Sequence, residues 1–209
     1  MNNQIALITG SNSGIGLATS LYLARRGFTV WATMRNVEKA GELHKAIETE
    51  KLPIEIARLD VCDDESVQSA VAQVLQKSGR IDVVVNNAGY GLRGAVEEVS
   101  LDEWKRQFET NFFGVIRVTQ AVLPQMRAQR SGAIVNISSV LGRFAIPFSG
   151  PYTASKFALE GLTETLRYEL GPVEHQSDPH RAGVHRHEIS RERAARPSRP
   201  RREFPVCRL

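Results

Sequence analysis

Five short apolar runs alternate with longer amphipathic segments over the first 170 residues, and this alternation restricts the fold more than any other feature. Short continuous apolar runs are typical of strands buried on both faces of a parallel sheet, whereas the intervening segments have helical spacing. The expected strands are residues 4–9, 28–33, 54–59, 81–85 and 133–137. The expected helices are residues 15–26, 37–50, 63–77, 102–129 and 151–170, the fourth of which contains Pro124 and can be kinked or broken there.

Strand–helix alternation of this kind predicts βαβ units with right-handed crossovers, and therefore an α/β fold. The expected architecture is a Rossmann-like doubly wound parallel sheet with strand order 3-2-1-4-5. A cofactor would bind at the switch between the first and fourth strands. With 209 residues and 42% hydrophobic content, the chain can form one sizeable core but not two comfortable domains.

A glycine-rich turn, TGSNSGIG, follows the first predicted strand at residues 9–16. Glycines there permit a tight turn, let bare backbone approach a pyrophosphate and allow the helix to pack against the sheet. The phosphate would lie at the helix N-terminus, where free N–H groups and the helix dipole favour an anion. Because the turn opens a βαβ unit, it predicts a dinucleotide site rather than a plain structural turn. The predicted contacts are Gly10, Ser11, Asn12, Ser13, Gly14, Ile15 and Gly16.

The segment after the second predicted strand, TMRN at residues 33–36, contains no carboxylate. An NAD site needs an acidic residue there to accept the ribose hydroxyls, and that acid would repel a 2′-phosphate. Arginine can instead pair with the phosphate. Arg35 therefore favours NADP(H) over NAD(H), the alternative being a surface arginine on a solvated loop.

The spacing G-x-x-x-G-x-G, together with the segment NNAG at residues 86–89, resembles the short-chain dehydrogenase/reductase family. The resemblance covers about residues 4–171. It implies that the NNAG segment steadies the sheet and that Asn87, Ala88 and Gly89 line the cofactor site, although an ordinary turn would also explain the segment. It further implies that Asp60 and Val61 contact the adenine ring.

A second group of residues predicts proton-transfer chemistry. Tyr152 and Lys156 are four residues apart, so both can face one cleft from the same helix. An ammonium group nearby stabilises a phenolate, and Tyr152 can then give or take the proton of a carbonyl or alcohol oxygen. Ser139, just past the fifth strand, would hold that oxygen. Taken alone, a Tyr/Lys pair at this spacing is usually a surface feature; here it follows the glycine turn and the NNAG segment in the family's order.

The family resemblance assigns two further roles and leaves one choice. It implies that Lys156 also binds the nicotinamide ribose, and that Asn111 in the segment TNFFG orders a water in a proton relay. Without the resemblance, Asn111 is equally well a packing or surface residue of a helix. Ser138 competes with Ser139, but the interval to the tyrosine selects Ser139 and leaves Ser138 a supporting role.

The segments PFSGPYTASKFALEG and TMRN look most like the hydroxysteroid and retinol dehydrogenase branch. This implies an NADP(H)-dependent oxidoreductase that interconverts a secondary alcohol and a carbonyl on a bulky, apolar, steroid- or retinoid-like substrate. Leu141, Phe144 and Phe148 are candidate wall residues of the substrate site, unless they are core residues. Family members commonly form homodimers or homotetramers through the two long helices, here expected at residues 102–129 and 151–170.

The character of the sequence changes after Leu170. Residues 172–209 form a basic tail rich in arginine, histidine and proline, without strand or helix periodicity, which predicts a disordered segment after an incomplete cofactor-binding domain at residues 1–171. The strands that the family places there are missing, so the fifth strand is expected to be an unprotected edge. The chain could then be a non-catalytic remnant that at most binds NADP(H).

A frameshift would account for this tail. Codons permitted for residues 173–189 can be chosen so that reading one base later gives SNIKVTLIEPGFIATK, which contains the family's missing strand and proline–glycine turn. The arginines of the tail could instead bind RNA or anionic lipid, and its four histidines could bind a metal, but their spacing matches no predicted helix.

Charge, cysteines and apolar runs narrow the remaining function classes. Residues 171–209 carry nine Arg against five acidic residues, which accounts for the whole net charge of +4, so the neutral body gives no reason to expect specific nucleic-acid binding. Two cysteines are too few for a disulfide framework or a metal cluster, and no metal is expected. No run approaches the length of a membrane span and no signal peptide is visible, which predicts a cytoplasmic protein.

Overall fold

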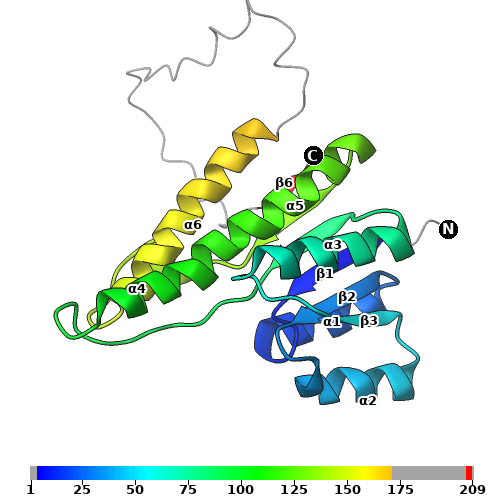
Figure 1. Cartoon of the computed structure of the whole chain (residues 1–209), viewed down its shortest axis with the longest axis horizontal. Coiled ribbons are helices and arrows are strands. Elements are labelled where there is room, and N and C mark those ends of the chain that lie inside the picture. The colour runs from blue at the N-terminus through cyan, green and yellow to red at the C-terminus, as the bar shows by residue number, and fades with distance from the viewer. Residues whose placement is uncertain (1–3, 171–205, 209) are drawn as a thin grey trace, which may run out of the picture.

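The computed structural model describes residues 4–170 and the backbone of residues 206–208. The predictions made for residues 171–205, including the frameshifted run and the histidines, lie outside the described residues. Figure 1 shows the sheet with its helices, and the long helices α5 and α6 extend beyond it.

The sheet has the predicted parallel order. Its strands follow the sequence β3-β2-β1-β4-β5-β6, and the first five of these are parallel to one another. The five parallel strands are β1 (Ile5–Thr9), β2 (Thr29–Met34), β3 (Ile54–Arg58), β4 (Val83–Asn86) and β5 (Ala133–Asn136). The main helices are α1 (Gly14–Arg25), α2 (Gly41–Glu50), α3 (Asp64–Ser78), α4 (Leu101–Phe108), α5 (Gly114–Gln129) and α6 (Gly150–Glu169).

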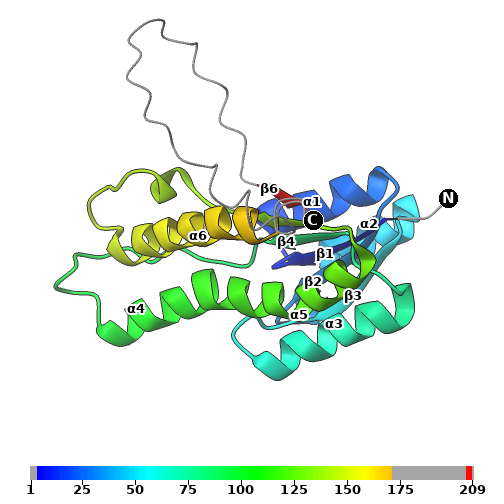
Figure 2. The ribbon, with the colours of Figure 1, turned by 90° about the horizontal axis from the view of Figure 1, so that it is seen from above.

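Helices cover both faces of the sheet, as the continuous apolar strands require. On one face, Leu7 of β1 belongs to a core cluster with buried residues of α3 and α5, such as Val71 and Val118. On the other face, Ile8 packs with residues of α1 and α2, including Leu17 and Leu43. Figure 2 shows α3 and α5 on one side of the sheet and α1 on the other. The predicted doubly wound α/β fold is therefore confirmed.

The far edge of the sheet differs from the prediction. The last strand, β6 (Val206–Arg208), pairs antiparallel with β5, in the register Ala133↔Arg208, Ile134↔Cys207 and Val135↔Val206. The expectation that the tail contributes no strand and leaves β5 unpaired is therefore wrong for these three residues. A three-residue strand is too short to produce a visible alternation of apolar and polar residues, which explains why the sequence pattern did not predict it.

The predicted helix over residues 102–129 is interrupted, although not at Pro124. A π-helical segment, η2 (Glu109–Phe113), separates α4 from α5, while α5 continues through Pro124. Short π-helical segments inside α-helices are rare overall, and those that occur are often found at functional sites. Here the segment contains Asn111, one of the predicted site residues.

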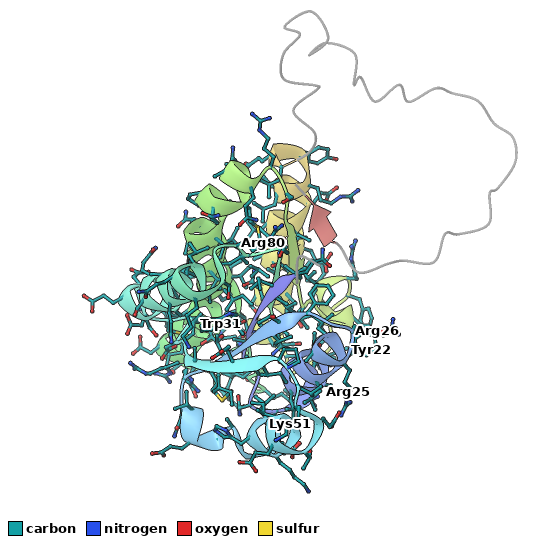
Figure 3. The ribbon with its side chains drawn as sticks, turned by 90° about the vertical axis from the view of Figure 1, so that its right-hand side faces the viewer. Tyr22, Arg25, Arg26, Trp31, Lys51 and Arg80 are labelled. Atoms are coloured by element: carbon teal, nitrogen blue, oxygen red, sulfur yellow. The ribbon has the colours of Figure 1, made fainter. Side chains whose placement is uncertain are left out.

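Exposed side chains at the C-terminal end of α1 contact α2 and one another. Arg25 makes two hydrogen bonds of 2.7 Å with the Glu50 carboxylate at the end of α2, and the Arg26 guanidinium carbon lies 4.9 Å from the centre of the Tyr22 ring. Figure 3 shows Tyr22, Arg25 and Arg26 near one another at the α1–α2 side of the molecule. Exposed ion pairs of this kind contribute little stability, so the core fixes the position of α1.

Candidate cofactor and catalytic site

A cavity of about 660 Å³ lies at the carboxyl ends of the parallel strands, where the strand order switches between β1 and β4. Most of the predicted site residues line it. These are Gly10, Asn12, Ser13, Gly14, Ile15, Arg35, Asp60, Val61, Asn87, Ala88, Gly89, Tyr152 and Lys156. Four predicted site residues are not part of this lining: Ser11, Gly16, Asn111 and Ser139.

The glycine turn forms the end of the cavity next to α1. Gly10 and Gly14 have φ values of +68° and +54°, a region that favours glycine. Ser13 precedes the first residue of α1 without capping the helix, and no acidic residue occupies its first turn. Ser11 is buried, and its hydroxyl donates to the Ile8 carbonyl at 3.0 Å, which fixes the turn. An uncapped helix N-terminus behind bare glycine backbone fits the phosphates of a dinucleotide.

The NNAG segment is attached to the glycine turn through Thr9, the first residue of the glycine motif, which was not among the predicted contacts. The Thr9 hydroxyl oxygen accepts hydrogen bonds of 3.0 Å from the backbone N–H groups of Asn87 and Ala88. The Asn87 side-chain amide donates to the Thr9 and Gly10 carbonyls at 2.9 and 3.0 Å. These bonds join residues almost eighty positions apart in the sequence, and they hold the two glycine-containing segments at one edge of the sheet.

Asn86, the first residue of this segment, belongs to a chain of buried polar side chains. Its amide donates to Asn136 Oδ1 at 2.9 Å, and the Asn136 amide donates to the Thr163 hydroxyl at 2.8 Å. The chain joins β4 and β5 to α6. The predicted role of the NNAG segment in steadying the sheet therefore has a structural basis in these bonds.

The end of the cavity that follows β2 and β3 is lined by Arg35, Asp60 and Val61, the residues predicted to recognise the adenosine half of a cofactor. Arg35 is exposed and lines the cavity directly after Met34 at the end of β2. Asp60 and Val61 line it from the end of β3, and the Asp60 carboxylate accepts a hydrogen bond of 3.0 Å from the Cys62 N–H group. The guanidinium group of Arg35 is therefore available to an anionic ligand at this end.

Tyr152 and Lys156 face the same cavity from α6. The Lys156 Nζ atom lies 5.7 Å from the centre of the Tyr152 ring and donates a hydrogen bond of 2.7 Å to the Ile137 carbonyl. Burial lowers the pKa of Lys156 to about 8, and the nearby Glu160 carboxylate partly opposes this shift. Lys156 is therefore mainly protonated at neutral pH, and its positive charge lies beside the phenol ring.

The two serines are placed differently from one another. The Ser139 hydroxyl accepts a hydrogen bond of 3.2 Å from the Leu141 N–H group at the start of the short helix η3 (Val140–Gly142), and Ser139 is not among the lining residues. Ser138 lines the cavity, and its buried hydroxyl makes no hydrogen bond within the described part of the chain. The choice of Ser139 as the serine that contacts the substrate therefore stays a prediction.

Asn111 lies behind the cavity wall and is only 1% exposed. Its amide nitrogen donates to the Tyr90 carbonyl at 2.9 Å and to the Ser155 hydroxyl at 3.3 Å, and its amide oxygen accepts from the Tyr90 N–H group at 3.1 Å. The side chain is thus occupied by bonds to its neighbours. The role of Asn111 in ordering a water stays a prediction.

The candidate substrate wall corresponds only partly to the prediction. Leu141 lines the cavity, whereas Phe144 and Phe148 are 54% and 67% exposed and lie outside the lining. The cavity is also lined by Tyr90, Gly91, Leu92 and Arg93, which were not predicted as site residues. These residues belong to the loop after β4. The path of that loop brings them to the cavity, and no sequence motif predicts such a path.

Comparisons with known proteins agree with this geometry. The family model for the short chain dehydrogenases matches residues 4–174. A 3-ketodihydrosphingosine reductase of Bacteroides thetaiotaomicron is 43% identical over 173 residues, which cover 82% of this chain and 60% of the relative. Retinol dehydrogenase 8 of Homo sapiens is 45% identical over 171 residues, covering 80% and 54%. Estradiol 17-beta-dehydrogenase 1 of Rattus norvegicus is 43% identical over 172 residues, covering 79% and 49%.

Solved structures show the same likeness. A gluconate 5-dehydrogenase from Burkholderia cenocepacia, in complex with NADP and tartrate, has a TM-score of 0.75 and 36% identity, over 81% of this chain and 66% of that one. A short-chain dehydrogenase/reductase from Burkholderia phymatum, in complex with NAD, has a TM-score of 0.77 and 30% identity, over 81% and 60%. The fold thus defines the class of the protein, a doubly wound α/β protein with a Rossmann-like parallel sheet.

The chain belongs to the short-chain dehydrogenase/reductase family, as its sequence motifs predicted. It spans 49–60% of the length of the three relatives named above. Among residues 4–170, no three His, Cys, Asp or Glu side chains are grouped so that they could hold a metal ion. None of the described helices is long and apolar enough to cross a membrane.

Proposed function

We propose that the chain is an NADP(H)-dependent oxidoreductase that interconverts a secondary alcohol and a carbonyl. The observation that carries this proposal is that Tyr152 and Lys156 line the same cavity as the glycine turn. When bound, the nicotinamide cofactor supplies or accepts a hydride. The chain's own side chains must then manage the proton that accompanies the hydride.

Tyr152 is the proton donor and acceptor of this proposal. In reduction its hydroxyl gives a proton to the carbonyl oxygen, and in oxidation the phenolate takes the alcohol proton. The ammonium group of Lys156 stabilises that phenolate and, in the family pattern, binds the nicotinamide ribose. The hydroxyl of Ser139 holds the substrate oxygen, and Asn111 orders a water in the proton relay to Lys156.

The preference for NADP(H) rests on Arg35. Its guanidinium lines the cavity at the adenosine end, where a 2′-phosphate would lie, and guanidinium–phosphate pairs are charge-assisted. Replacing Arg35 with alanine should weaken NADPH binding on the order of tenfold to a hundredfold and leave NADH binding nearly unchanged. The exposed Lys45 on α2 provides a matched control, because Lys45→Ala removes a positive charge away from the cavity. An equal loss for both nucleotides would argue against this role.

The substrate proposal is a bulky apolar carbonyl or alcohol of steroid or retinoid type. It is supported by the identity with a retinol dehydrogenase and an estradiol dehydrogenase, and by the apolar side chains of Leu92 and Leu141 in the cavity lining. The test is consumption of NADPH by the purified chain with a 17-ketosteroid, which is reduced to a secondary alcohol, and with retinal, an aldehyde that is reduced to a primary alcohol. Tyr152→Phe should reduce turnover about 10²- to 10⁴-fold while nucleotide binding persists. Equal turnover in the variant would contradict the assignment.

A second candidate is a non-catalytic remnant that at most binds NADP(H). The specific observation in its favour is the change in sequence character after Leu170, where the family resemblance implies further strands. Nucleotide binding without any turnover of the carbonyls would support the remnant. The frameshift explanation of the tail belongs to this candidate, and a coding sequence whose shifted frame lacks the run SNIKVTLIEPGFIATK would refute it.

The proposal also covers assembly and compartment: a cytoplasmic homodimer or homotetramer formed through α4–α5 and α6. Large apolar side chains support this assembly, because Leu101, Phe113 and Phe157 on these helices are 69%, 45% and 46% exposed. Light scattering should give the mass of two or four chains. A monomer at micromolar concentration would contradict it.

A further inference from the structure

Two amide side chains, one helical turn apart, hold the backbone of the segment Tyr90–Leu92 with four hydrogen bonds. Gln107 of α4 donates to the Tyr90 carbonyl at 2.8 Å and accepts from the Leu92 N–H group at 2.7 Å. Asn111 of η2 donates to the same Tyr90 carbonyl at 2.9 Å and accepts from the Tyr90 N–H group at 3.1 Å. We call these two side chains and their four bonds the amide clamp.

Gln107 is entirely buried, with 0% of its surface exposed. Both ends of its amide are used by the clamp, so the side chain can neither turn nor reach solvent without breaking a bond. A buried polar group left without its partner costs more than the bond itself contributes. Among residues 4–170, Gln107 Oε1 is the acceptor for Leu92 N–H, whereas the Tyr90 carbonyl has Asn111 as a second donor. Gln107 therefore governs the Leu92 end of the segment.

The residue between the two clamped positions lies against the proposed proton donor. A Cβ atom built on Gly91 would be 3.6 Å from Cδ2 and 3.8 Å from Cε2 of Tyr152. The backbone of Gly91 therefore forms a wall beside the phenol ring, and Gly91 itself lines the cavity with Tyr90 and Leu92. Through Gly91, the position of this segment sets the space available to the ring of Tyr152.

We propose that Gln107 is a positioning residue for Tyr152, acting through the backbone of residues 90–92. The inference rests on the proposed oxidoreductase function, because the position of the ring matters to turnover only if Tyr152 handles the proton. Gln107 is not among the residues that line the cavity, so its effect on the reaction is indirect. Asn111 supports one end of the segment, and Gln107 fixes the other.

The chain offers a matched control for this proposal. Gln129, near the end of α5, donates to the Ile81 carbonyl at 2.9 Å and accepts from the Ile81 N–H group at 3.1 Å. It thus clamps backbone in the same way, but at the opposite end of the strands from the cavity. Gln107→Met and Gln129→Met each remove one such amide and keep the length of the side chain.

The decisive readout is fluorine NMR of the full chain labelled with fluorotyrosine. The chain has four tyrosines, so a Tyr152→Phe spectrum assigns the resonance of Tyr152. Gln107→Met should move or broaden that resonance, and Gln129→Met should leave it unchanged. This comparison needs neither cofactor nor substrate, so it decides the inference even if the chain does not turn over. An unchanged Tyr152 resonance in folded Gln107→Met would overturn the inference.

Turnover gives the second readout and separates the inference from the proposed function. Gln107→Met should lower kcat on the order of tenfold to a hundredfold with KM nearly unchanged, as expected for a displaced proton donor. A wild-type chain without turnover would count against the proposed function alone. A higher KM with an unchanged kcat would overturn the positioning role.

Gly91→Ala provides a variant that keeps the clamp. The added methyl group would meet the ring at ordinary van der Waals distance, so Gly91→Ala should fold. It therefore keeps the inference testable even if Gln107→Met does not fold. The Tyr152 resonance should again move. If it stays in place, the segment does not set the environment of the ring and the inference fails.

Discussion

At Gly16 the chain has no room for a side chain. A Cβ atom there would lie 2.3 Å from the Gly10 carbonyl oxygen and 2.4 Å from the Asn87 amide nitrogen. Gly16 thus lets α1 approach the turn before it and leaves space for the Asn87 amide that joins the turn to the loop after β4. The third glycine of the motif serves packing, while the first two form the turn itself.

Replacing Gly16 with alanine should therefore damage both stability and nucleotide binding. We expect the free energy of unfolding to fall by about 1–3 kcal/mol, the usual cost of overpacking, together with weaker NADPH binding. Gly41→Ala is the control, because a Cβ atom added to Gly41, at the start of α2, would meet nothing within 4 Å. It should change stability by no more than about 0.5 kcal/mol. Urea unfolding of the two variants measures the difference, and equal values would refute this account of Gly16.

Lys156 predicts a pH dependence of stability. Its pKa is about 8 in the folded chain and is lowered from an ordinary value of 10.5, so between these values the unfolded chain binds more protons than the folded one. Unfolding therefore becomes less favourable as the pH rises from about 8 to 10.5. The wild type should gain stability relative to Lys156→Met across this interval, by an amount on the order of 3 kcal/mol. Denaturant titrations of both chains at several pH values test this, and a constant difference would contradict it.

At the residue scale, the sequence predicted the residues that form a local motif and missed those that act over long distances. The glycine turn and the pair Tyr152 and Lys156 are recognisable because their spacing fixes their local geometry and because they occur in the order of the family's motifs. Gln107 and the hydrogen bonds of Thr9 escaped notice because the partners are backbone groups, which carry no sequence signature. The placement of Ser138 and Ser139 depends on one peptide turn, which periodicity cannot determine.

Among the elements, the π-helical segment η2 is the least expected. A helical pattern over residues 102–129 shows no sign of one extra residue in a turn, so the segment could not be predicted from periodicity. Arg117 of α5 connects this segment to the cofactor site. It pairs with Glu109 at the start of η2, contacts Asp64 of α3 at 2.6 Å and donates to the Val61 carbonyl at 3.1 Å.

We expect Arg117→Met to loosen η2 and the Val61 loop together. The free energy of unfolding should fall by about 1–2 kcal/mol, since these charged hydrogen bonds are only partly screened by solvent, and NADPH affinity should fall with it. Lys105→Met is the control, because its pair with Asp102 is exposed on both sides and worth little. Calorimetric titration with NADPH compares the two. An Arg117→Met chain that binds as tightly as the control would show that the connection is unimportant.

For the molecule as a whole, the pairing of β6 with β5 determines how the sheet ends. Removing residues 206–209 would expose the backbone of β5 as an edge, and unpaired edges favour association between chains. We expect the shortened chain to aggregate faster at equal concentration, as light scattering would record. A shortened chain with unchanged aggregation and melting temperature would mean that β6 adds nothing to the sheet.

The order of the five parallel strands could be predicted because alternation and right-handed crossovers leave few topologies. The sixth strand could not, because three residues give no pattern and their pairing depends on a partner about seventy positions away. The family's remaining strands have no counterpart among the described residues. Whether the body of the chain is sufficient for nucleotide binding is therefore the central question about this molecule.

A thermal melt of the purified full-length chain, alone and with NADPH or NADH, addresses that question most directly. Ligands that bind the folded state raise the melting temperature, by an amount that grows with the logarithm of their concentration relative to Kd. We expect one cooperative transition that NADPH shifts upward more than NADH does, with the difference removed in Arg35→Ala. The absence of a transition, or a transition that neither nucleotide moves, would contradict the claim that this chain forms a working cofactor site.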